Sequence, residues 1–173
     1  MAAEKLIVAA ETALKPFAVG AFTRTPVGVE AVVKREDLPA AVKALVDARW
    51  GYLSAITGLD HPWPKAAKPA PKPGETSAEP AEPAGPTEDR LEALYQFVNG
   101  PVVATLRVSV AYHDAAVPTI CPVIPSATLY ERELQEMFGI VVQGTPETSR
   151  LLLPDDWPDH VYPLRKAYKV SKA

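Results

Sequence analysis

Three carboxylates on one short segment are the first residues in this chain that could do chemistry. Glu131, Glu133 and Glu136 lie within six positions of one another, and Arg132 stands between the first two. Paired carboxylates act as general acid and base when their environments set their pKa values apart. On a helix, however, these three positions point to different sides, so at most two could share a site. With His160 as a further group, a self-contained hydrolase is one hypothesis.

The other reactive side chains form no complete catalytic or metal-binding set. His61, His113 and His160 lie far apart in the sequence and in no ligand spacing. Cys121 is the one cysteine, and a single thiolate can form no internal disulfide and hold no iron–sulfur cluster. We expect it to be a buried, inert thiol in a strand. The nine glycines are dispersed and make no phosphate-binding loop. We therefore predict no cofactor, no metal and no catalytic site in this chain alone.

Composition describes an ordinary globular chain. Its 173 residues suffice for one domain with a real core, and 47% of them are hydrophobic. A net charge of −3 predicts neither a general nucleic-acid binder nor a membrane-surface binder. No apolar run approaches the roughly eighteen residues that a bilayer span needs, and the short apolar run near the N-terminus is a poor signal peptide. We expect no nucleic acid, no direct membrane span and no export.

A helix must position the carboxylates, and the sequence contains its signals. Thr128 and Glu131 have the spacing of a capping box, which predicts a helix that begins at Thr128. Gly139 is the expected left-handed cap at its end. Arg132 and Glu136, four positions apart, are expected to pair. The apolar stripe that would close onto a sheet consists of Tyr130, Leu134, Met137 and Phe138.

Upstream of this helix, periodicity predicts an α+β domain over residues 1–124. Helices are expected over 3–14 and from Asp37, the cap of the second helix, to a stop at Gly51. The inward stripe of the second helix would be Leu38, Val42, Leu45 and Val46. Strands are predicted over 28–34, 52–59, 93–98, 102–112 and 117–123, the first of them edge-like. This order predicts a small antiparallel or mixed sheet with helices on one face. Residues 125–173 would complete the domain as a helix and an extended C-terminal tail.

Residues 62–86 interrupt the pattern with eight prolines among twenty-five residues. Such a segment has no apolar face to offset its ordering entropy, and its prolines favour polyproline II. We interpret it as an insertion loop within the domain. A scaffold role, in which this loop binds an adaptor protein, is an alternative hypothesis.

The tail is extended and aromatic, and it ends in a basic cluster. Three prolines between 154 and 163 exclude helix there, and the segment carries Trp157 and Tyr162 before it reaches Leu164, Arg165 and Lys166. Aromatic residues and arginine supply much of the binding energy at protein interfaces. The tail is therefore suited to wrapping over a partner, and equally to lying on its own sheet.

Four features of this stretch resemble a known family. They are the block YERELQEMFGI, the Gly144-x-Pro146 turn, Arg150 and the closing PLRK. Together they are similar to the thirty-kilodalton subunit of respiratory complex I (the C subunit of NADH:quinone oxidoreductase) and to homologous subunits of energy-converting, membrane-bound [NiFe] hydrogenases. The resemblance covers roughly residues 28–168.

The resemblance implies a non-catalytic assembly subunit without cofactors of its own, in the peripheral arm on the cytoplasmic face of the membrane. Its partners would be the hydrogenase-like large subunit, a homologue of the forty-nine-kilodalton complex I subunit, and the small iron–sulfur subunit. Iron–sulfur clusters and possible Ni-Fe would belong to those partners. An ionic network among the charged residues of the helix and tail would fix the tail and the large subunit. The implied subunit-interface residues are Glu131, Arg132, Glu133, Glu136, Met137, Phe138, Gly139, Arg150, Trp157, Tyr162, Pro163, Leu164, Arg165 and Lys166.

Departures from the complex I pattern favour the hydrogenase branch. Complex I members usually carry histidine where this chain has Thr145, and aspartate where it has Ala167. The segment LLLPDDWPDHVYPLRK also looks more like the hydrogenase branch. The C subunit of an NADH:quinone or related quinone oxidoreductase is the alternative, and the hydrolase is a distant one.

Overall fold

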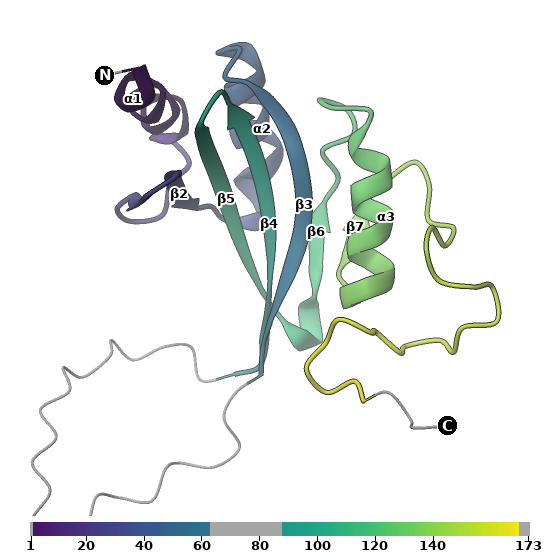
Figure 1. Ribbon diagram of the computed structural model, residues 1–173. Helices are drawn as coiled ribbons and strands as arrows, with labels where there is room; N and C mark the ends of the chain where they lie inside the picture. The colour runs from purple at the N-terminus through teal and green to yellow at the C-terminus, as the bar shows by residue number, and fades with distance from the viewer. Residues whose placement is uncertain (1, 63–87, 170–173) are drawn as a thin grey trace, which may run out of the picture.

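The computed structural model describes residues 2–62 and 88–169 (Figure 1). The insertion predicted at 62–86 lies outside the described residues, apart from Pro62. The helices and strands are α1 (Ala2–Leu14), β1 (Thr23–Thr25), β2 (Gly28–Val32), α2 (Leu38–Asp47), β3 (Tyr52–His61), β4 (Arg90–Asn99), β5 (Val102–Ala111), β6 (Ala116–Pro118), α3 (Ala127–Phe138) and β7 (Val141–Gln143).

The larger sheet contains five strands in the order β1-β2-β5-β4-β3. Strand β4 pairs antiparallel with both β3 and β5, while β2 runs parallel to β5 and antiparallel to β1. In this register Tyr95 of β4 lies between Ile56 of β3 and Leu106 of β5. All three are buried, because side chains alternate along a strand and one face of the sheet meets the core.

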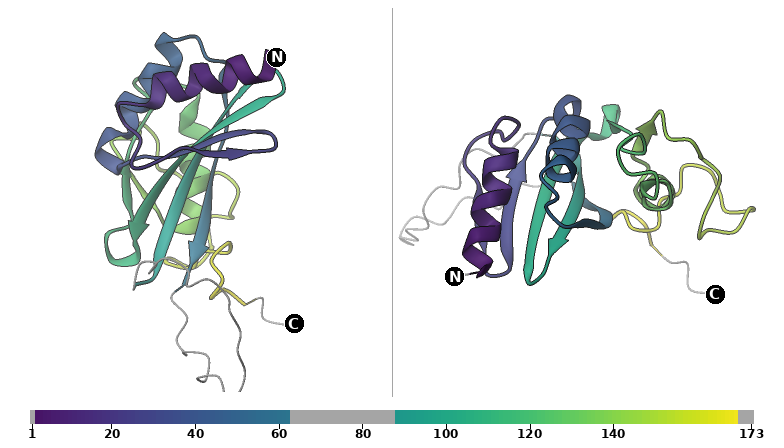
Figure 2. Two further views of the ribbon diagram at one scale, coloured as in Figure 1. Left: turned by 90° about the vertical axis from the view of Figure 1, so that its left-hand side faces the viewer. Right: turned by 90° about the horizontal axis from the view of Figure 1, so that it is seen from above.

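The α-helices supply the other half of the same core. Leu14 of α1, Leu45 of α2 and Leu134 of α3 are at most 1% exposed and belong to one buried cluster with the sheet residues. Helices α1 and α2 pack against each other (Figure 2). The indole of Trp50 donates to the carbonyl oxygen of Leu6 at 2.7 Å, which ties the end of α2 to α1. The predicted α+β fold with a mixed sheet is confirmed.

The opposite face of the sheet is polar. Arg107 of β5 donates to Glu92 of β4 and, at 2.9 Å, to Glu30 of β2. The hydrogen bond to Glu92, with a smaller contribution from Glu30, raises the pKa of Arg107. Opposite charges on neighbouring strands stabilise a sheet by roughly 0.2–1 kcal/mol a pair. This face is therefore joined by charge pairs across three strands.

Some details of the predicted strands and helices were wrong. Strand β1 was not predicted, and it makes 28–32 an inner strand rather than an edge. The strand expected over 117–123 is β6, three residues long, which pairs in parallel with β7 in a separate two-stranded sheet. Pro118 limits it because proline cannot donate to a strand ladder. Val46, expected to point inward, is 40% exposed.

Helix α3 lies close against β3, and a glycine permits the approach. A methyl group on Gly58 would lie 2.7 Å from the ring of Phe138, whose side chain is buried against the sheet. Non-bonded carbon atoms prefer separations of about 3.5–4.0 Å. The missing side chain at position 58 therefore sets the distance between the sheet and the charged helix.

The substitution Gly58→Ala tests this contact. We expect it to lower the free energy of unfolding by about 1–3 kcal/mol, because Phe138 must leave its position to admit the new methyl group. Chemical denaturation measures the change. Thr57→Ser on the exposed side of the same strand should change stability by less than about 0.5 kcal/mol. Equal stability of the two variants would contradict the close approach.

Candidate functional site

Helix α3 ends as the sequence predicts but does not begin so. Gly139 has φ 69° and its N–H donates to the carbonyl oxygen of Gln135 at 2.9 Å, which is a left-handed cap. At the other end, Ser126 is the N-cap and makes no side-chain capping bond. The capping box predicted for Thr128 and Glu131 does not form, because the Glu131 side chain points into the core.

The buried carboxylate of Glu131 joins α3 to the turn that follows β6. It is 0% exposed and accepts hydrogen bonds from the Thr119 hydroxyl at 2.8 Å, the Ile120 N–H at 2.8 Å and the Cys121 thiol at 3.2 Å. Three donors offset much of the cost of burying the charge. Burial also raises the pKa of the Cys121 thiol. This cysteine is buried as predicted, but it lies in a turn and not in a strand.

Glu136 binds the first part of the tail through backbone N–H groups. Its oxygens accept from Leu151 at 3.0 Å, Leu152 at 2.8 Å and Leu153 at 3.3 Å. Three successive amides that converge on one carboxylate make a small anion-binding nest. Hydrogen bonds to a charged acceptor are the stronger kind, so Glu136 fixes the turn of the tail at 151–153.

Two arginines continue this attachment. Arg132 donates to the carbonyl oxygens of Ser149 at 2.8 Å and Arg150 at 2.7 Å, and to the Ser149 hydroxyl at 2.9 Å. Arg150 in turn donates to the carbonyl oxygens of Pro154 and Asp155 and pairs with Asp159 at 3.0 Å. The pairing predicted between Arg132 and Glu136 is wrong, because each side chain binds the tail instead.

The end of the tail is held by the guanidinium of Arg165. It lies 4.8 Å from the ring centre of Tyr112 and 4.6 Å from that of Tyr162, and its Nε donates to the carbonyl oxygen of Phe138 at 2.6 Å. A guanidinium within about 6 Å of an aromatic ring centre, over the ring face, makes a cation–π interaction, and Arg165 makes two. The last carbonyls of a helix favour a positive partner. Arg165 therefore connects the sheet side, the end of α3 and the tail.

Backbone contacts complete the anchor. The N–H of Leu164 donates to the carbonyl oxygen of Met137 at 3.2 Å. The N–H of Lys166 donates to Asp60 at 2.7 Å, and Asp60 also accepts from the Tyr112 hydroxyl. Sequence reasoning missed Asp60 and Tyr112. The only local signal was their position at strand ends, because their partners lie far away in the chain.

Most of the predicted interface residues therefore meet where the tail packs on α3, but not through the ionic network expected of them, and Glu131 is instead buried against residues 119–121. Within residues 2–62 and 88–169, no carboxylate of α3 forms an ion pair with a basic residue of the tail. Glu136 and Arg132 of α3 bind the tail through its backbone and the Ser149 hydroxyl, Arg165 binds a backbone carbonyl and two aromatic rings, and Arg150 binds tail carbonyls and Asp159. Lys166 takes part through its backbone, and Leu164 is 53% exposed. The sequence left open whether the tail wraps over a partner or packs on its own domain, and in the structure it packs on its own domain.

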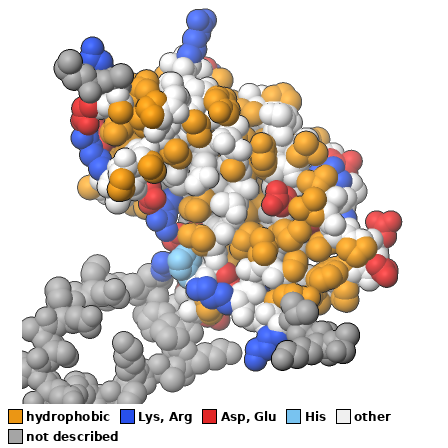
Figure 3. Space-filling view, in the orientation of Figure 1, with side chains coloured by type: hydrophobic (Ala, Val, Ile, Leu, Met, Phe, Trp, Pro, Cys, Tyr) orange, Lys and Arg blue, Asp and Glu red, His pale blue; other side chains and the backbone are white. Residues whose placement is uncertain are grey.

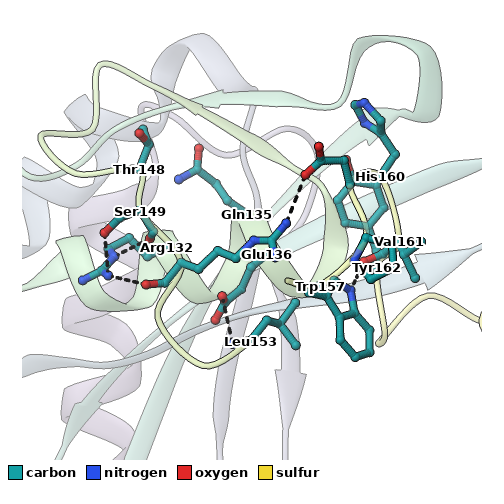
Figure 4. A pocket seen from close by; sticks show the side chains of 13 residues that line it. Arg132, Gln135, Glu136, Thr148, Ser149, Leu153, Trp157, His160, Val161 and Tyr162 are labelled. Carbon is teal, nitrogen blue, oxygen red and sulfur yellow. Dashed lines mark hydrogen bonds and ion pairs between the residues drawn. The ribbon is translucent and has the colours of Figure 1, made fainter. Parts of the chain in front are cut away.

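A pocket of about 380 Å³ lies between α3 and the tail (Figure 4). Figure 4 shows Trp157 and Tyr162 on the side opposite Arg132 and Ser149. The lining residues are Arg132, Gln135, Glu136, Thr148, Ser149, Arg150, Leu153, Trp157, Pro158, Asp159, His160, Val161 and Tyr162.

The pocket brings together two members of the proposed hydrolase site, Glu136 and His160. Both oxygens of Glu136 are nevertheless occupied by the backbone of the tail, and Glu131 is sealed in the core. In the part of the chain that the structure describes, no three His, Cys, Asp or Glu side chains are grouped to hold a metal ion. The geometry is that of a structural attachment between a helix and an extended segment.

An α+β domain with a charged helix attached to its own C-terminal segment defines the class of this protein, and sequence comparison identifies the family. The chain belongs to the family described as respiratory-chain NADH dehydrogenase, 30 Kd subunit, whose model matches residues 31–173.

Two curated relatives represent the two branches that the sequence resembles. The C subunit of NADH-quinone oxidoreductase from Nocardioides sp. is 33% identical over 144 residues, which cover 80% of this chain and 48% of that protein. Formate hydrogenlyase subunit 5 of Escherichia coli is 47% identical over 62 residues, which cover 36% of this chain and 11% of that protein. The chain thus spans about half or less of the length of these relatives.

A solved structure has the same fold. It is described as the membrane-bound sulfane sulfur reductase, an archaeal respiratory membrane complex, and the matched chain aligns with a TM-score of 0.64. The match covers 98% of this chain and 86% of the other at 19% sequence identity. At that identity the likeness concerns the fold alone.

The substitution Glu136→Gln tests the nest at 151–153. An amide in place of the carboxylate removes the charge and one acceptor oxygen, so the stability should fall by about 1–3 kcal/mol. Hydrogen exchange at the amides of Leu151, Leu152 and Leu153 should accelerate. Glu133→Gln removes the same charge from the same helix, and no hydrogen bond to Glu133 is present among the described residues. Equal exchange in both variants would argue against the nest.

A second pair of variants tests the end of the tail. Arg165→Lys keeps the charge but loses the flat guanidinium, so we expect the anchor to weaken by about 1–2 kcal/mol. Hydrogen exchange at the amides of Leu164 and Lys166 reports this. Lys166→Ala should leave both amides protected, because Lys166 contributes its backbone N–H. If these amides lost protection in Lys166→Ala but not in Arg165→Lys, the role assigned to the Arg165 guanidinium would be refuted.

Proposed function

We propose that this chain is a non-catalytic assembly subunit of a complex I-like oxidoreductase, specifically an energy-converting, membrane-bound [NiFe] hydrogenase. In this proposal α3 and the tail dock on the hydrogenase-like large subunit. The observation that carries it is the attachment of the tail to α3 through Glu136, Arg132 and Arg165, which gives the segment a defined outer surface.

The exposed side chains of this region support a docking role. Leu129 of α3, Val141 of β7, and Leu152 and Leu164 of the tail are each 52–60% exposed. Figure 3 shows hydrophobic side chains gathered over the part of the surface that α3 and the tail form. Apolar patches rimmed by charge are typical of protein–protein interfaces. A partner that covers this surface would remove the leucines from water.

The formate hydrogenlyase relative supports the hydrogenase branch. Its matched segment is 47% identical to this chain, yet it is only 11% of that protein. In that relative the segment is thus part of a much longer polypeptide. The segment is expected to contact other parts of that long polypeptide, and we propose that the corresponding contact of this chain is the hydrogenase-like large subunit.

The C subunit of an NADH:quinone oxidoreductase is the second candidate. The match to the Nocardioides protein favours it, because that match covers 80% of this chain. Both candidates place the protein in the peripheral arm, at the cytoplasmic face of the membrane, beside a small iron–sulfur subunit. Under both, the iron–sulfur clusters, and any Ni-Fe centre, belong to partner subunits. Within residues 2–62 and 88–169, every helix is too short or too polar to span a bilayer.

Affinity purification of the tagged full chain from its own cells tests the proposal. We expect the hydrogenase-like large subunit and the small iron–sulfur subunit to co-purify, with hydrogen-evolving activity in the preparation. Quinone reduction without hydrogen chemistry would select the second candidate. A chain that purifies alone would overturn both.

A surface variant connects the association to α3 and the tail. Leu129→Asp places a charge on a side chain in the first turn of α3 that is 52% exposed, so the fold should persist while association weakens at least about tenfold. Val8→Asp on α1, where the side chain is 45% exposed, is the matched control. If both variants retain the large subunit equally, the docking surface lies elsewhere.

A further inference from the structure

The pocket between α3 and the tail contains more hydrogen-bond donors than the chain itself uses. The clearest example is Gln135. Its Oε1 accepts from the N–H of Val142 at 3.1 Å, and this bond fixes the orientation of the side-chain amide. The Nε2 group, with two N–H donors, has no acceptor within the described residues. Figure 4 shows Gln135 between Thr148 and Ser149 on one side and Tyr162 and His160 on the other.

Both arginines of the pocket leave donors unused as well. Arg132 donates through Nε and Nη2 to the tail, and its Nη1 has no partner in the described parts of the chain. Arg150 donates through Nη1 and Nη2, and its Nε is likewise without an acceptor there. Nη2 of Arg150 also retains one N–H, so the two guanidinium groups and one amide keep six N–H donors without a partner among the described residues.

The acceptors of the pocket are largely occupied. Both oxygens of Glu136 accept backbone N–H groups. Asp159 accepts from Arg150, and its side chain is 87% exposed at the outer rim. The carbonyl oxygens of Pro154 and Asp155 accept from Arg150, and that of Val161 accepts from the Trp157 indole at 2.8 Å. What the pocket lacks is an acceptor, and a carboxylate supplies two oxygens and a charge that complements guanidinium.

We infer that this pocket receives the acidic side chain, Asp or Glu, of an extended segment of the partner subunit. The inference rests on the proposed docking function and names the chemistry of the partner. A volume of about 380 Å³ admits a side chain with part of its backbone. Trp157 and Tyr162 offer apolar contact to its methylene groups. The unused donors of Gln135, Arg132 and Arg150 bind its carboxylate.

Peptide titration of the full chain tests this inference without any complex. The probes are blocked tripeptides, N-acetyl-Ala-Glu-Ala-amide and its Gln and Lys counterparts, together with free acetate. The readout is the ¹H–¹⁵N spectrum, in particular the side-chain amide of Gln135, the Nε of Arg150 and the indole of Trp157. We expect saturable shifts with the Glu peptide, at least about tenfold tighter than with the Gln or Lys peptide.

The variant Gln135→Glu is the sharp test of the site. A carboxylate still accepts from the N–H of Val142, but it replaces the two free donors by an acceptor and a negative charge. Binding of the Glu peptide should fall at least about tenfold. Gln143→Glu adds the same charge at an exposed position outside the pocket lining and should bind like the unmodified chain.

The outcomes separate this inference from the proposed function. Equal shifts with all three peptides, no shift with the Glu peptide, or equal losses in both variants would each overturn the acidic-side-chain site. Acetate that saturates the same signals as tightly as the peptide would assign the pocket to a small free carboxylate and overturn it too. None of these results would alter co-purification with the large subunit, which tests docking itself.

Discussion

One guanidinium joins three parts of this fold. Arg165 lies over the rings of Tyr112, which follows β5, and Tyr162 of the tail, and it donates to the carbonyl oxygen of Phe138 at the end of α3. The neighbouring amide of Lys166 meets Asp60 at the end of β3. Because these contacts converge on two adjacent residues, the path of the tail from 144 to 164 is fixed at its far end. The attachment at Glu136 then fixes its middle.

The charged side chains of α3 bind backbone groups of the tail, and this stabilises the tail more than exposed ion pairs would. Exposed ion pairs contribute little and weaken with salt. Charged side chains that bind backbone groups in a defined geometry do more, because each contact also satisfies a polar group of an irregular segment. The tail has no helix or strand assigned between residues 144 and 169, so side chains of α3 take the place of regular backbone pairing. A rigid surface thus arises from a segment without secondary structure.

Sequence reasoning was accurate where a local rule decides the outcome. The left-handed cap at Gly139 and the strand predicted over 102–112, observed as Val102–Ala111, follow from backbone sterics and strand period. It was wrong where one residue could satisfy two rules. Glu131 fits a capping box by spacing, but its position on the inner face of α3 made burial decisive. The contact between Asp60 and Lys166 could not be predicted from local sequence patterns, since the two residues are separated by 106 positions.

The pairing of β3 with β4 bears on how sequences of this kind can change over time. His61 and Arg90 are register partners, so the two ends of the intervening sequence leave the sheet side by side. When two chain ends are held side by side, each doubling in the length of the connection costs only about 0.6 kcal/mol of closure entropy. Additions between these strands therefore leave the strand register, and with it the Asp60 anchor, in place. This part of the gene can gain or lose codons while the surface formed by α3 and the tail stays the same.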